Sequence, residues 1–552
     1  MSLWERIDSA LVVSHAPNRL DNHELRAIPV RDRQWGTAAY GVFWMGAISA
    51  AGAWIATPLT SGLGVWSGVF AMFGGMILSS IGLAVNSRAG AVYRIPYPVF
   101  CRSCFGVYGA YWPVFCRLLV TLAFAAIGVA TAAQLLSVMF TCISPNWEKI
   151  PNHMGVDSIL TSGDMISFLI FWLVLCLFSA VPVPRWRFFV YIKIVIYWAA
   201  TLGLLGWVLH QTGGAGPILS YPASVTGSKY AWTMVQFVFY FLNQSSSYIS
   251  NAADFSRYAT KPRDPLVGHL ITFPIANLVN TIVGFIILGS SVPLFGEAQW
   301  NPGTFLKMFL EQNYTPGGRA AMFFISFALL LSQIVSSALE NNLPGAFDMM
   351  GLFPRYINLR RSFFLVLISA WILQPWYLLG SASVFISFIS GFSTFLSAII
   401  GVQLAQYYVI ARGHLDMEAL FSADPGGPYY FWWGVNWRAF AAYVLGVAPN
   451  FYGFLGQMGV SVPTSVTHLQ YFSCILGIGV SFIFFLAFTF LFPPKNSLPR
   501  PAKWMEPEDF IDPTDPWLCQ DPAERASIQN ELSGMQGVGT DGSLFIESKT
   551  LK

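Results

Sequence analysis

The sequence predicts an all-α integral membrane protein with about twelve transmembrane helices. Three observations lead to this fold class. Of 552 residues, 55% are hydrophobic and only 10% are charged, whereas soluble domains carry about 25% charged residues. Apolar runs long enough to cross a bilayer recur along the chain. Every second linker between these runs carries arginines, as in proteins that cross the membrane many times.

The apolar runs divide the chain into three regions. Residues 1–35 have charges throughout and form a predicted cytosolic segment, because a cleaved signal peptide would contain an apolar core. Residues 493–552 are polar, acidic and rich in proline, which predicts a disordered cytosolic tail. The multi-span domain between them covers residues 36–492. Its spans are predicted near residues 36–58, 63–86, 111–141, 165–182, 188–210, 230–252, 267–292, 320–345, 363–380, 382–411, 438–458 and 470–492.

Basic residues predict the orientation of these spans. They are concentrated in the linkers after the second, fourth, sixth and eighth spans, and the opposite linkers contain few. The positive-inside rule places the richer linkers in the cytosol. Both termini of this multi-pass protein are therefore predicted to be cytosolic. The residues concerned are Arg88, Arg94, Arg102, Arg185, Arg187, Arg257, Lys261, Arg263, Arg355, Arg360 and Arg361.

An acidic residue follows the eighth apolar run without a break. The run 320–339 already suffices to span a bilayer, yet it leads directly into Glu340, Asn341 and Asn342. We expect the helix to continue and to hold Glu340 within the membrane. A carboxylate there costs about 3 kcal/mol and marks a substrate or ion pathway. The alternative is a helix that ends early, with Glu340 near the cytosolic surface.

Two spans contain small or polar residues at matching positions of two five-span halves. These are Gly46–Gly52 in the first span and Asn243–Ser247 in the sixth. Interrupted helices in this arrangement are typical of inverted-repeat transporters with a binding site at the midplane. Asn243 and Gln244 are predicted to lie beside unwound backbone and to line that site.

The sequence contains no motif typical of an enzyme or of a bound cofactor. HExxH, GxSxG and nucleotide-binding loops are absent. Seven scattered cysteines predict neither a disulfide framework nor a metal site. A net charge of +3 without a long basic run argues against nucleic acid as a partner. Asn313 begins an Asn-x-Thr sequon in a predicted outward loop, and its glycosylation stays open.

Several sequence blocks resemble one transporter family. Residues 86–109 read NSRAGAVYRIPYPVFCRSCFGVYG, which is similar to the signature linker of the nucleobase–cation symporter-1 family. The similarity covers roughly residues 20–492 and is greatest to the fungal uracil/allantoin/uridine permease branch. Further blocks that agree are NHEL at 22–25, NAADFSRYATKPRD at 251–264, FPRYINLRR at 353–361 and GVAPN at 446–450.

The resemblance implies a LeuT-like fold, with two inverted five-helix repeats and two extra helices. It implies a symporter that imports a small heterocyclic compound such as a nucleobase, allantoin or a nucleoside. Fungal members generally use protons, so a co-transported proton is expected, and sodium is the alternative. A carrier of a vitamin (thiamine, pyridoxine, nicotinamide riboside) or of a specialised metabolite is a second interpretation, and a non-transporting ligand sensor is a third. The oligomeric state stays open.

The resemblance also assigns substrate contacts. A third-span Trp of the family, and the Gln four residues later, align with Phe124 and Gly128. Phe124 keeps a face for ring stacking, and Gly128 is expected to leave a void that admits a bulkier ligand. The stacking aromatic of the sixth span aligns with Ser245, so Tyr240, Phe241 or Tyr248 would have to replace it. Asn341 matches the eighth-span Asn that binds the ring edge.

Coupling residues differ from the family pattern as well. The first-span Glu of many fungal relatives aligns with Ala47, so Glu340 is predicted to be the relocated proton carrier. Lys193 matches a fifth-span Lys and is expected to pair with a carboxylate, or else to snorkel to the cytosolic surface. Asp254 and Arg257 are predicted to latch an inner gate. The eighth-span hydroxyls of Ser332, Ser336 and Ser337 could bind sodium if sodium were coupled, but packing between helices is the favoured interpretation of these residues.

Overall fold

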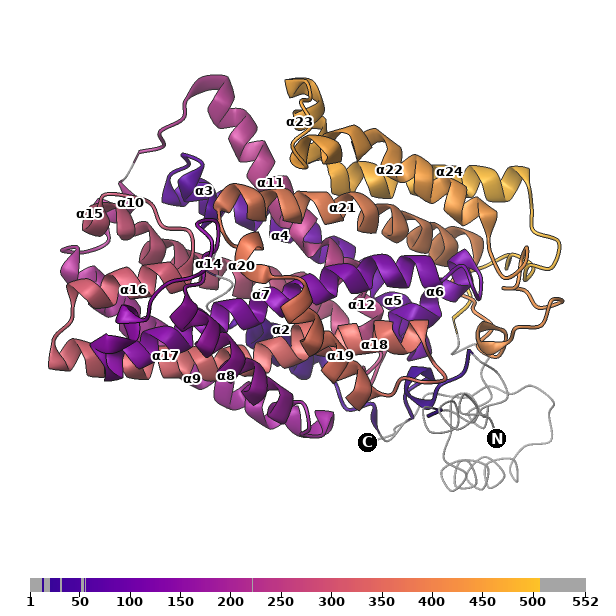
Figure 1. Cartoon of the computed structure of the whole chain (residues 1–552). Helices are drawn as coiled ribbons and strands as arrows, with labels where there is room; N and C mark the ends of the chain where they lie inside the picture. Colours follow the sequence, from indigo (N-terminus) through magenta and orange to yellow (C-terminus); the bar gives the residue numbers. More distant parts are fainter. Residues whose placement is uncertain are drawn as a thin grey trace.

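A computed structural model of the chain describes residues 12–13, 20–29, 32–50, 54, 56–220 and 222–506. Within this part the regular structure is helical, apart from two isolated β-bridges. The long helices lie side by side along the longest dimension of the molecule (Figure 1). They are α2 (Thr37–Ile48), α4 (Val65–Asn86), α7 (Tyr111–Ile143), α8 (Ser162–Phe178), α9 (Trp186–Gln211), α11 (Gly227–Ser250), α14 (Phe273–Gly289), α17 (Pro316–Ser336), α19 (Leu359–Ile372), α21 (Ala382–Leu404), α22 (Trp437–Gln457) and α24 (Ser473–Leu491).

Eight helices in the described part are long and apolar enough to cross a membrane. They contain α4, α7, α9, α14, α17, α21, α22 and α24. The other four predicted spans correspond to α2, α8, α11 and α19, which are shorter or more polar. The helices are therefore consistent with the predicted number of spans, and the all-α fold class is confirmed.

Side chains at the helix starts fix where several spans begin. Thr161 and Asp164 form a reciprocal capping box at the start of α8, in which each side chain accepts the other residue's backbone N–H. The Asn358 side chain accepts the N–H of Arg361 at the start of α19, and Ser381 does the same for Val384 in α21. These caps satisfy backbone donors that the first turn of a helix leaves unpaired.

The helices pack in an order that brings distant spans together. Helix α4 contacts α11 and α14, and α17 contacts α7 and α9. Helices α22 and α24 lie together along one edge of the molecule and pack on α21 (Figure 1). The short helices α5 (Arg88–Tyr93), α6 (Tyr97–Phe105), α12 (Ala252–Ser256) and α18 (Leu343–Leu352) gather towards one end. We call this the linker end, because the arginine-rich linkers lie there.

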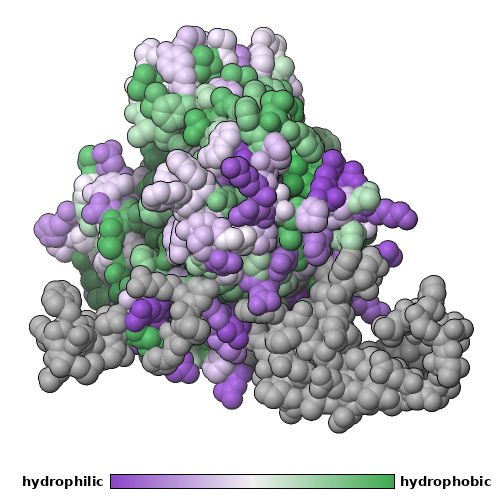
Figure 2. Space-filling view, turned by 90° about the vertical axis from the view of Figure 1, so that its right-hand side faces the viewer, coloured by the Kyte–Doolittle hydropathy of each residue, from purple (hydrophilic) through white to green (hydrophobic). Residues whose placement is uncertain are grey.

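Polar side chains cover the middle of the linker end. Figure 2 views this end directly and shows hydrophilic residues at its centre, with hydrophobic residues above and beside them. Large apolar side chains on the flanks of the bundle are exposed, among them Phe70, Val195 and Ile483. This distribution fits helices that cross a bilayer with the linker end in water.

The first span is broken, as predicted. Helix α2 ends at Ile48, the next two residues are not helical, and the next α-helix of the described part is α3 (Thr57–Thr60). The carbonyl of Ile48 accepts a hydrogen bond from Asn280 Nδ2 on α14 at 3.2 Å, and the carbonyl of Ser49 accepts one from Ser332 on α17. Side chains from two other spans thus replace the partners that the broken helix no longer supplies.

The sixth span is not broken where we predicted it to be. Helix α11 runs through Asn243–Ser247 to Ser250, and the break falls at Asn251, before α12. The hydroxyls along α11 bond carbonyls of their own helix: Ser245 to Phe241 at 3.0 Å, and Ser246 to Asn243 at 2.7 Å. A polar run in a span therefore did not require unwound backbone, because these side chains are satisfied within the helix.

The eighth span continues past the length of a bilayer, as predicted. Helix α17 leads without interruption into the π-helical turn η7 (Ser337–Asn342) and then into α18. The Glu340 side chain in η7 is 15% exposed, so the alternative of a helix end at the cytosolic surface is wrong. A π-helical turn is frequent at functional sites.

Asn243→Ala tests the structural role of a residue that we predicted to bind substrate. The Asn243 amide oxygen accepts from Ser393 Oγ at 3.1 Å and from the Cys474 N–H at 3.2 Å, and its nitrogen donates to the Tyr471 carbonyl at 3.3 Å. Removing it leaves buried donors unpaired, so we expect the free energy of unfolding to fall by about 1–3 kcal/mol, with an unchanged KM for transport. Melting temperature and uptake kinetics measure both quantities.

Ser245→Ala is the matched control, because the hydroxyl that it removes bonds a carbonyl of the same helix. We expect a smaller loss of stability than for Asn243→Ala. A raised KM in Asn243→Ala at unchanged melting temperature would instead return Asn243 to the substrate site.

Candidate functional site

A cavity of about 400 Å³, including its mouth, lies between the third, sixth and eighth spans. Residues of α7, α11, η7 and α18 contribute to its wall, together with Asn251 at the break of the sixth span. The wall combines aromatic rings, amides, hydroxyls, one carboxylate and one guanidinium. Its residues are Arg117, Thr121, Phe124, Gln244, Ser247, Tyr248, Asn251, Glu340, Asn341 and Pro344.

Two aromatic rings give the cavity faces for a flat ligand. Phe124 is held edge-on by Phe388 and Phe392, with ring centroids 5.7 and 5.6 Å apart. Tyr248 lies across the cavity, and its hydroxyl donates to Glu340 Oε2 at 3.4 Å. Of the three aromatic residues that we considered as replacements at Ser245, Tyr248 lines the cavity, whereas Tyr240 and Phe241 do not. A ring bound between such faces gains stacking and apolar contact.

Ser245 and Asn243, which we predicted to bind substrate, do not line the cavity. The Ser245 hydroxyl lies 3.7 Å from Met76 Sδ on α4, on the side of α11 that packs against that helix. Asn243 is 1% exposed and joins α11 to the chain segments around Ser393 and Cys474. Their neighbour Gln244 does line the cavity, so one of the three polar sixth-span candidates is placed as expected.

The predicted void beside Gly128 is wrong, because the eighth span fills that space. A Cβ atom at Gly128 would lie 3.0 Å from Ser337 Oγ and 3.4 Å from Gln333 Nε2. Gly128 is not among the cavity residues. The missing side chain lets α17 and η7 approach α7 closely, as small residues do between membrane helices.

Lys193 and Glu340 form a buried ion pair behind the cavity wall. The Nζ of Lys193 lies 3.7 Å from Glu340 Oε1 and also donates to Ser336 Oγ. The Lys193 side chain is 1% exposed, so the alternative of snorkelling to the surface is wrong and pairing with a carboxylate is confirmed. Asn341, the next residue after Glu340, lines the cavity as well. A residue of the cavity wall and a member of the ion pair therefore share one turn of helix.

The hydroxyls that we considered as sodium ligands all have protein partners. Ser332 donates to the Ser49 carbonyl, Ser336 accepts from Lys193, and Ser337 accepts from Gln333 Nε2 at 3.3 Å. The Lys193 ammonium thus binds the Ser336 hydroxyl oxygen, which a sodium ion could otherwise bind. Of the described His, Cys, Asp and Glu residues, no three cluster as metal ligands would.

A second charged cluster closes the linker end of the cavity. Arg117 on α7 contacts Asp348 on α18, with Nε 3.1 Å from Oδ1 and Nη2 2.5 Å from Oδ2. The same Nη2 lies 3.3 Å from Asp254 Oδ2 on α12. All three side chains are buried. Our sequence analysis missed Arg117 and Asp348, although a lone arginine inside the predicted third span was a signal for a buried ion pair.

The predicted gate residues have different partners. Asp254 accepts the backbone N–H of Tyr97 at 2.7 Å in addition to its contact with Arg117. Arg257 donates to the carbonyls of Glu24 and Arg26, the latter at 2.8 Å. Asp254 therefore joins the sixth-span region to the third span and to the linker helix α6, and Arg257 connects the N-terminal segment to the same region. A gating role for both stays a prediction.

A chain of hydrogen bonds holds the backbone at the break of the first span. Trp54 Nε1 donates to Tyr197 Oη at 2.6 Å, and Tyr197 in turn donates to Asn280 Oδ1. Asn280 donates to the carbonyl of Ile48, where α2 ends. One chain of hydrogen bonds therefore connects both sides of the first-span break through the fifth and seventh spans.

A family model described as "Permease for cytosine/purines, uracil, thiamine, allantoin" matches residues 27–477. The chain belongs to this permease family. The allantoin permease of Saccharomyces cerevisiae is 32% identical over 512 residues, which cover 89% of this chain and 80% of the relative. The uracil permease of the same organism is 28% identical over 527 residues, covering 92% and 83%. The resemblance drawn from the sequence blocks is thus confirmed.

A solved structure establishes the fold. The structure of Mhp1, described as a nucleobase-cation-symport-1 family transporter in a closed conformation with bromovinylhydantoin bound, superposes with a TM-score of 0.69. The match covers 86% of this chain and 97% of that one at 17% identity. At this identity the likeness shows the fold alone, and it confirms the predicted LeuT-like arrangement.

Arg117→Gln tests the charged cluster at the linker end. The substitution leaves two buried carboxylates without their cation, so we expect the free energy of unfolding to fall by about 3–5 kcal/mol. The melting temperature of the full chain, followed by size-exclusion chromatography of a fluorescent fusion, measures the loss. Arg117→Gln combined with Asp348→Asn should recover part of it, because one of the two uncompensated carboxylates is removed. Equal stability of Arg117→Gln and the parent chain would contradict the cluster.

Proposed function

We propose that this permease imports a small heterocyclic compound, such as a nucleobase, allantoin or a nucleoside, together with protons. The observation that carries the proposal is the shared turn of helix that places Glu340, paired with Lys193, beside Asn341 in an aromatic cavity. Phe124 and Tyr248 offer stacking faces, and the Gln244 and Asn341 amides can read both donors and acceptors at a ring edge. The protein acts as a carrier with no chemical step.

Protons suit the site better than sodium as the coupled ion. Sodium needs several oxygen ligands, and two of the candidate oxygens already accept hydrogen bonds: the Ser49 carbonyl accepts from Ser332, and the Ser336 hydroxyl accepts from Lys193. Glu340 can carry a proton and reaches the cavity. The arginine-rich linkers support a cytosolic location of the linker end and of both termini. Import from outside the cell implies the plasma membrane as the place of transport.

A vitamin carrier is the second candidate, and one feature of this chain favours it. A carboxylate lies in the cavity beside the amide that would hold the ring edge. Thiamine, which the family description includes, carries a permanently charged ring that a carboxylate attracts. Nicotinamide riboside has the same property. These substrates therefore belong in any uptake panel.

Competition for uptake tests both candidates. We would express the chain in a permease-deficient yeast and test uracil, allantoin, uridine, cytosine, thiamine, pyridoxine and nicotinamide riboside at two external pH values. We expect one class to accumulate, with faster uptake at the lower pH because protons are co-transported. Binding without accumulation would indicate a sensor, and pH-independent uptake that requires sodium would contradict proton symport.

Glu340→Gln tests the proton carrier. The amide keeps the size of the side chain but cannot take up and release a proton, so accumulation against a gradient should be lost while exchange across the membrane persists. The measurement compares net accumulation with counterflow of labelled substrate in vesicles. Glu311→Gln is the matched control, because Glu311 is exposed at the opposite end of the eighth-span region. Unchanged pH-driven accumulation in Glu340→Gln would remove Glu340 from the coupling mechanism.

A further inference from the structure

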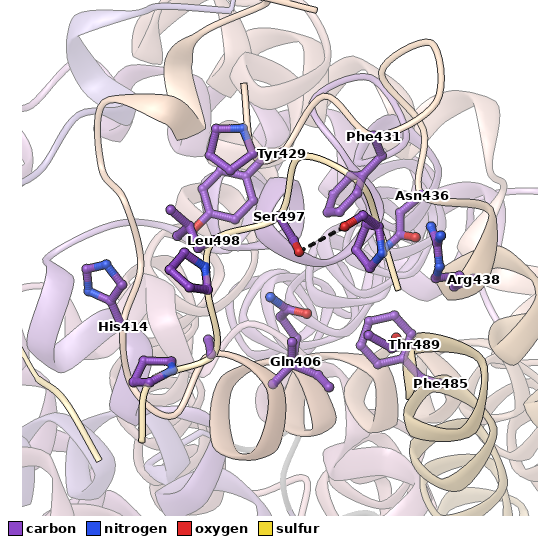
Figure 3. A pocket seen from close by; sticks show the side chains of 16 residues that line it. Gln406, His414, Tyr429, Phe431, Asn436, Arg438, Phe485, Thr489, Ser497 and Leu498 are labelled. Atoms are coloured by element: carbon purple, nitrogen blue, oxygen red, sulfur yellow. Dashed lines mark hydrogen bonds between the residues drawn. The ribbon is translucent and has the colours of Figure 1, made fainter. Parts of the chain in front are cut away.

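A second cavity, of about 490 Å³ including its mouth, lies at the linker end and far from the substrate cavity along the chain. Figure 3 shows its wall, which the ends of the last membrane helices, the loop before α22 and the first part of the C-terminal tail build together. Gln406, Asn436, Arg438 and Thr489 supply polar groups, and Phe431 and Phe485 supply apolar surface. Nothing in the transport cycle proposed above uses this space.

The tail forms a fixed roof over this cavity. Residues 494–501 cross it, and Arg412 donates to the carbonyl of Pro501 at 3.0 Å. Further along, the Met505 N–H donates to the Arg412 carbonyl at 2.8 Å, and Glu506 pairs with Arg88 at 2.7 Å. The beginning of the predicted disordered tail is therefore bound to the membrane domain, and residues 507–552 lie outside the described part. Because hydrogen bonds hold this roof in place, the cavity has a defined wall on the side of the tail.

Two buried polar atoms face this cavity without a partner in the described residues. They are Asn436 Oδ1 and Thr489 Oγ1, in side chains that are 2% and 9% exposed. By contrast Ser481, on the same helix as Thr489, bonds the Gly477 carbonyl at 2.7 Å. An unpartnered buried polar atom costs about 1–3 kcal/mol, so a ligand that supplies one acceptor and one donor would recover this energy.

The charge around the cavity is positive. No Asp or Glu is among its lining residues, and Arg438 reaches it from the first turn of α22. Asn436 is the N-cap of that helix but makes no side-chain capping bond, so the positive end of the helix dipole faces the same region. Lys495 and Arg500 are exposed on the roof. An anionic group is the ligand that this surrounding favours.

The cavity adjoins the surface that faces lipid, because Arg438 in its wall donates to the carbonyl of Phe492 at the end of α24. Leu491 and Phe492 at the end of α24 are 70% and 54% exposed, and Trp437 beside them packs against Arg438, whose guanidinium lies 5.0 Å from the ring centroid. Arg500 lies 5.2 Å from the ring centroid of Phe490 in the same way. Aromatic rings and arginines at the end of a span are typical of the boundary between hydrocarbon and headgroups.

We propose that this cavity binds the headgroup of an anionic phospholipid from the cytosolic leaflet. Its phosphate lies against Arg438 and accepts from Thr489 Oγ1, and a hydroxyl or ammonium group of the headgroup donates to Asn436 Oδ1. The acyl chains leave past Leu491 and Phe492 into the bilayer. Headgroups with both a net negative charge and hydrogen-bond donors, such as those of phosphatidylserine and phosphatidylinositol, meet these requirements, whereas phosphatidylcholine does not.

The test is the thermal stability of the purified full chain with added lipid. We expect phosphatidylinositol or phosphatidylserine to raise the melting temperature by about 2–4 °C over phosphatidylcholine. Arg438→Gln should remove this difference. Arg360→Gln, the same change at an exposed arginine elsewhere on the linker end, should keep it. Native mass spectrometry should show the corresponding loss of bound anionic lipid from Arg438→Gln alone.

Thr489→Val is a second variant, and its folding should not depend on whether the cavity binds lipid. The hydroxyl that it removes has no described partner, so the lipid-free protein should be at least as stable as the parent chain. Its response to anionic lipid should nevertheless be reduced. An equal lipid response of Thr489→Val, Arg438→Gln and the parent chain would overturn the proposal. So would an equal shift from soluble inositol phosphate, because the cavity would then take a free anion and not a lipid.

Discussion

The bilayer core offers no water to backbone groups that a broken helix leaves unpaired, and the arrangement of the spans around the site follows from this constraint. The first span ends at Ile48, and the fifth, seventh and eighth spans are connected by the side chains that compensate for that end. Asn280 donates to the Ile48 carbonyl and Ser332 to the Ser49 carbonyl. Tyr197 orients Asn280 by donating to its amide oxygen. A single interruption in the first span therefore holds the fifth, seventh and eighth spans together, and the eighth span also contributes to the wall of the cavity.

The same scarcity of water explains the two charge clusters. Lys193 and Glu340 balance each other, whereas Arg117 faces two carboxylates. Each cluster presents one member to the cavity, Glu340 on one side and Arg117 on the other. Buried ion pairs add little net stability over apolar residues, but breaking one is costly. They therefore act mainly to keep particular spans in contact, the fifth with the eighth and the third with the sixth and eighth.

Hydrophobicity and charge in the sequence predicted the features that depend on one segment of the chain alone. The spans and the continuation of the eighth helix through Glu340 follow from the length of apolar runs and from the distance to the next charge, whereas the sequence left pairing and snorkelling of Lys193 open. Asn243, Ser245 and Gly128 do not line the cavity, and this could not be predicted because it depends on which neighbouring helix faces them. Arg117 was missed for the same reason: its partners Asp254 and Asp348 lie far away in the sequence and meet it only in the folded bundle.

The pairing of Lys193 with Glu340 has a consequence for coupling by protons. A proton on Glu340 removes the negative charge that neutralises Lys193, and no other described carboxylate lies within ion-pair distance of that ammonium. A buried, unpaired ammonium is unfavourable, so the fifth span must move away from the eighth or Lys193 must lose its proton. Asn341 is the residue next to Glu340 and lines the cavity. A movement of the eighth span at Glu340 would therefore also change the contacts of a substrate bound at Asn341. Proton and substrate would then bias one rearrangement of two spans, which is the thermodynamic requirement for symport.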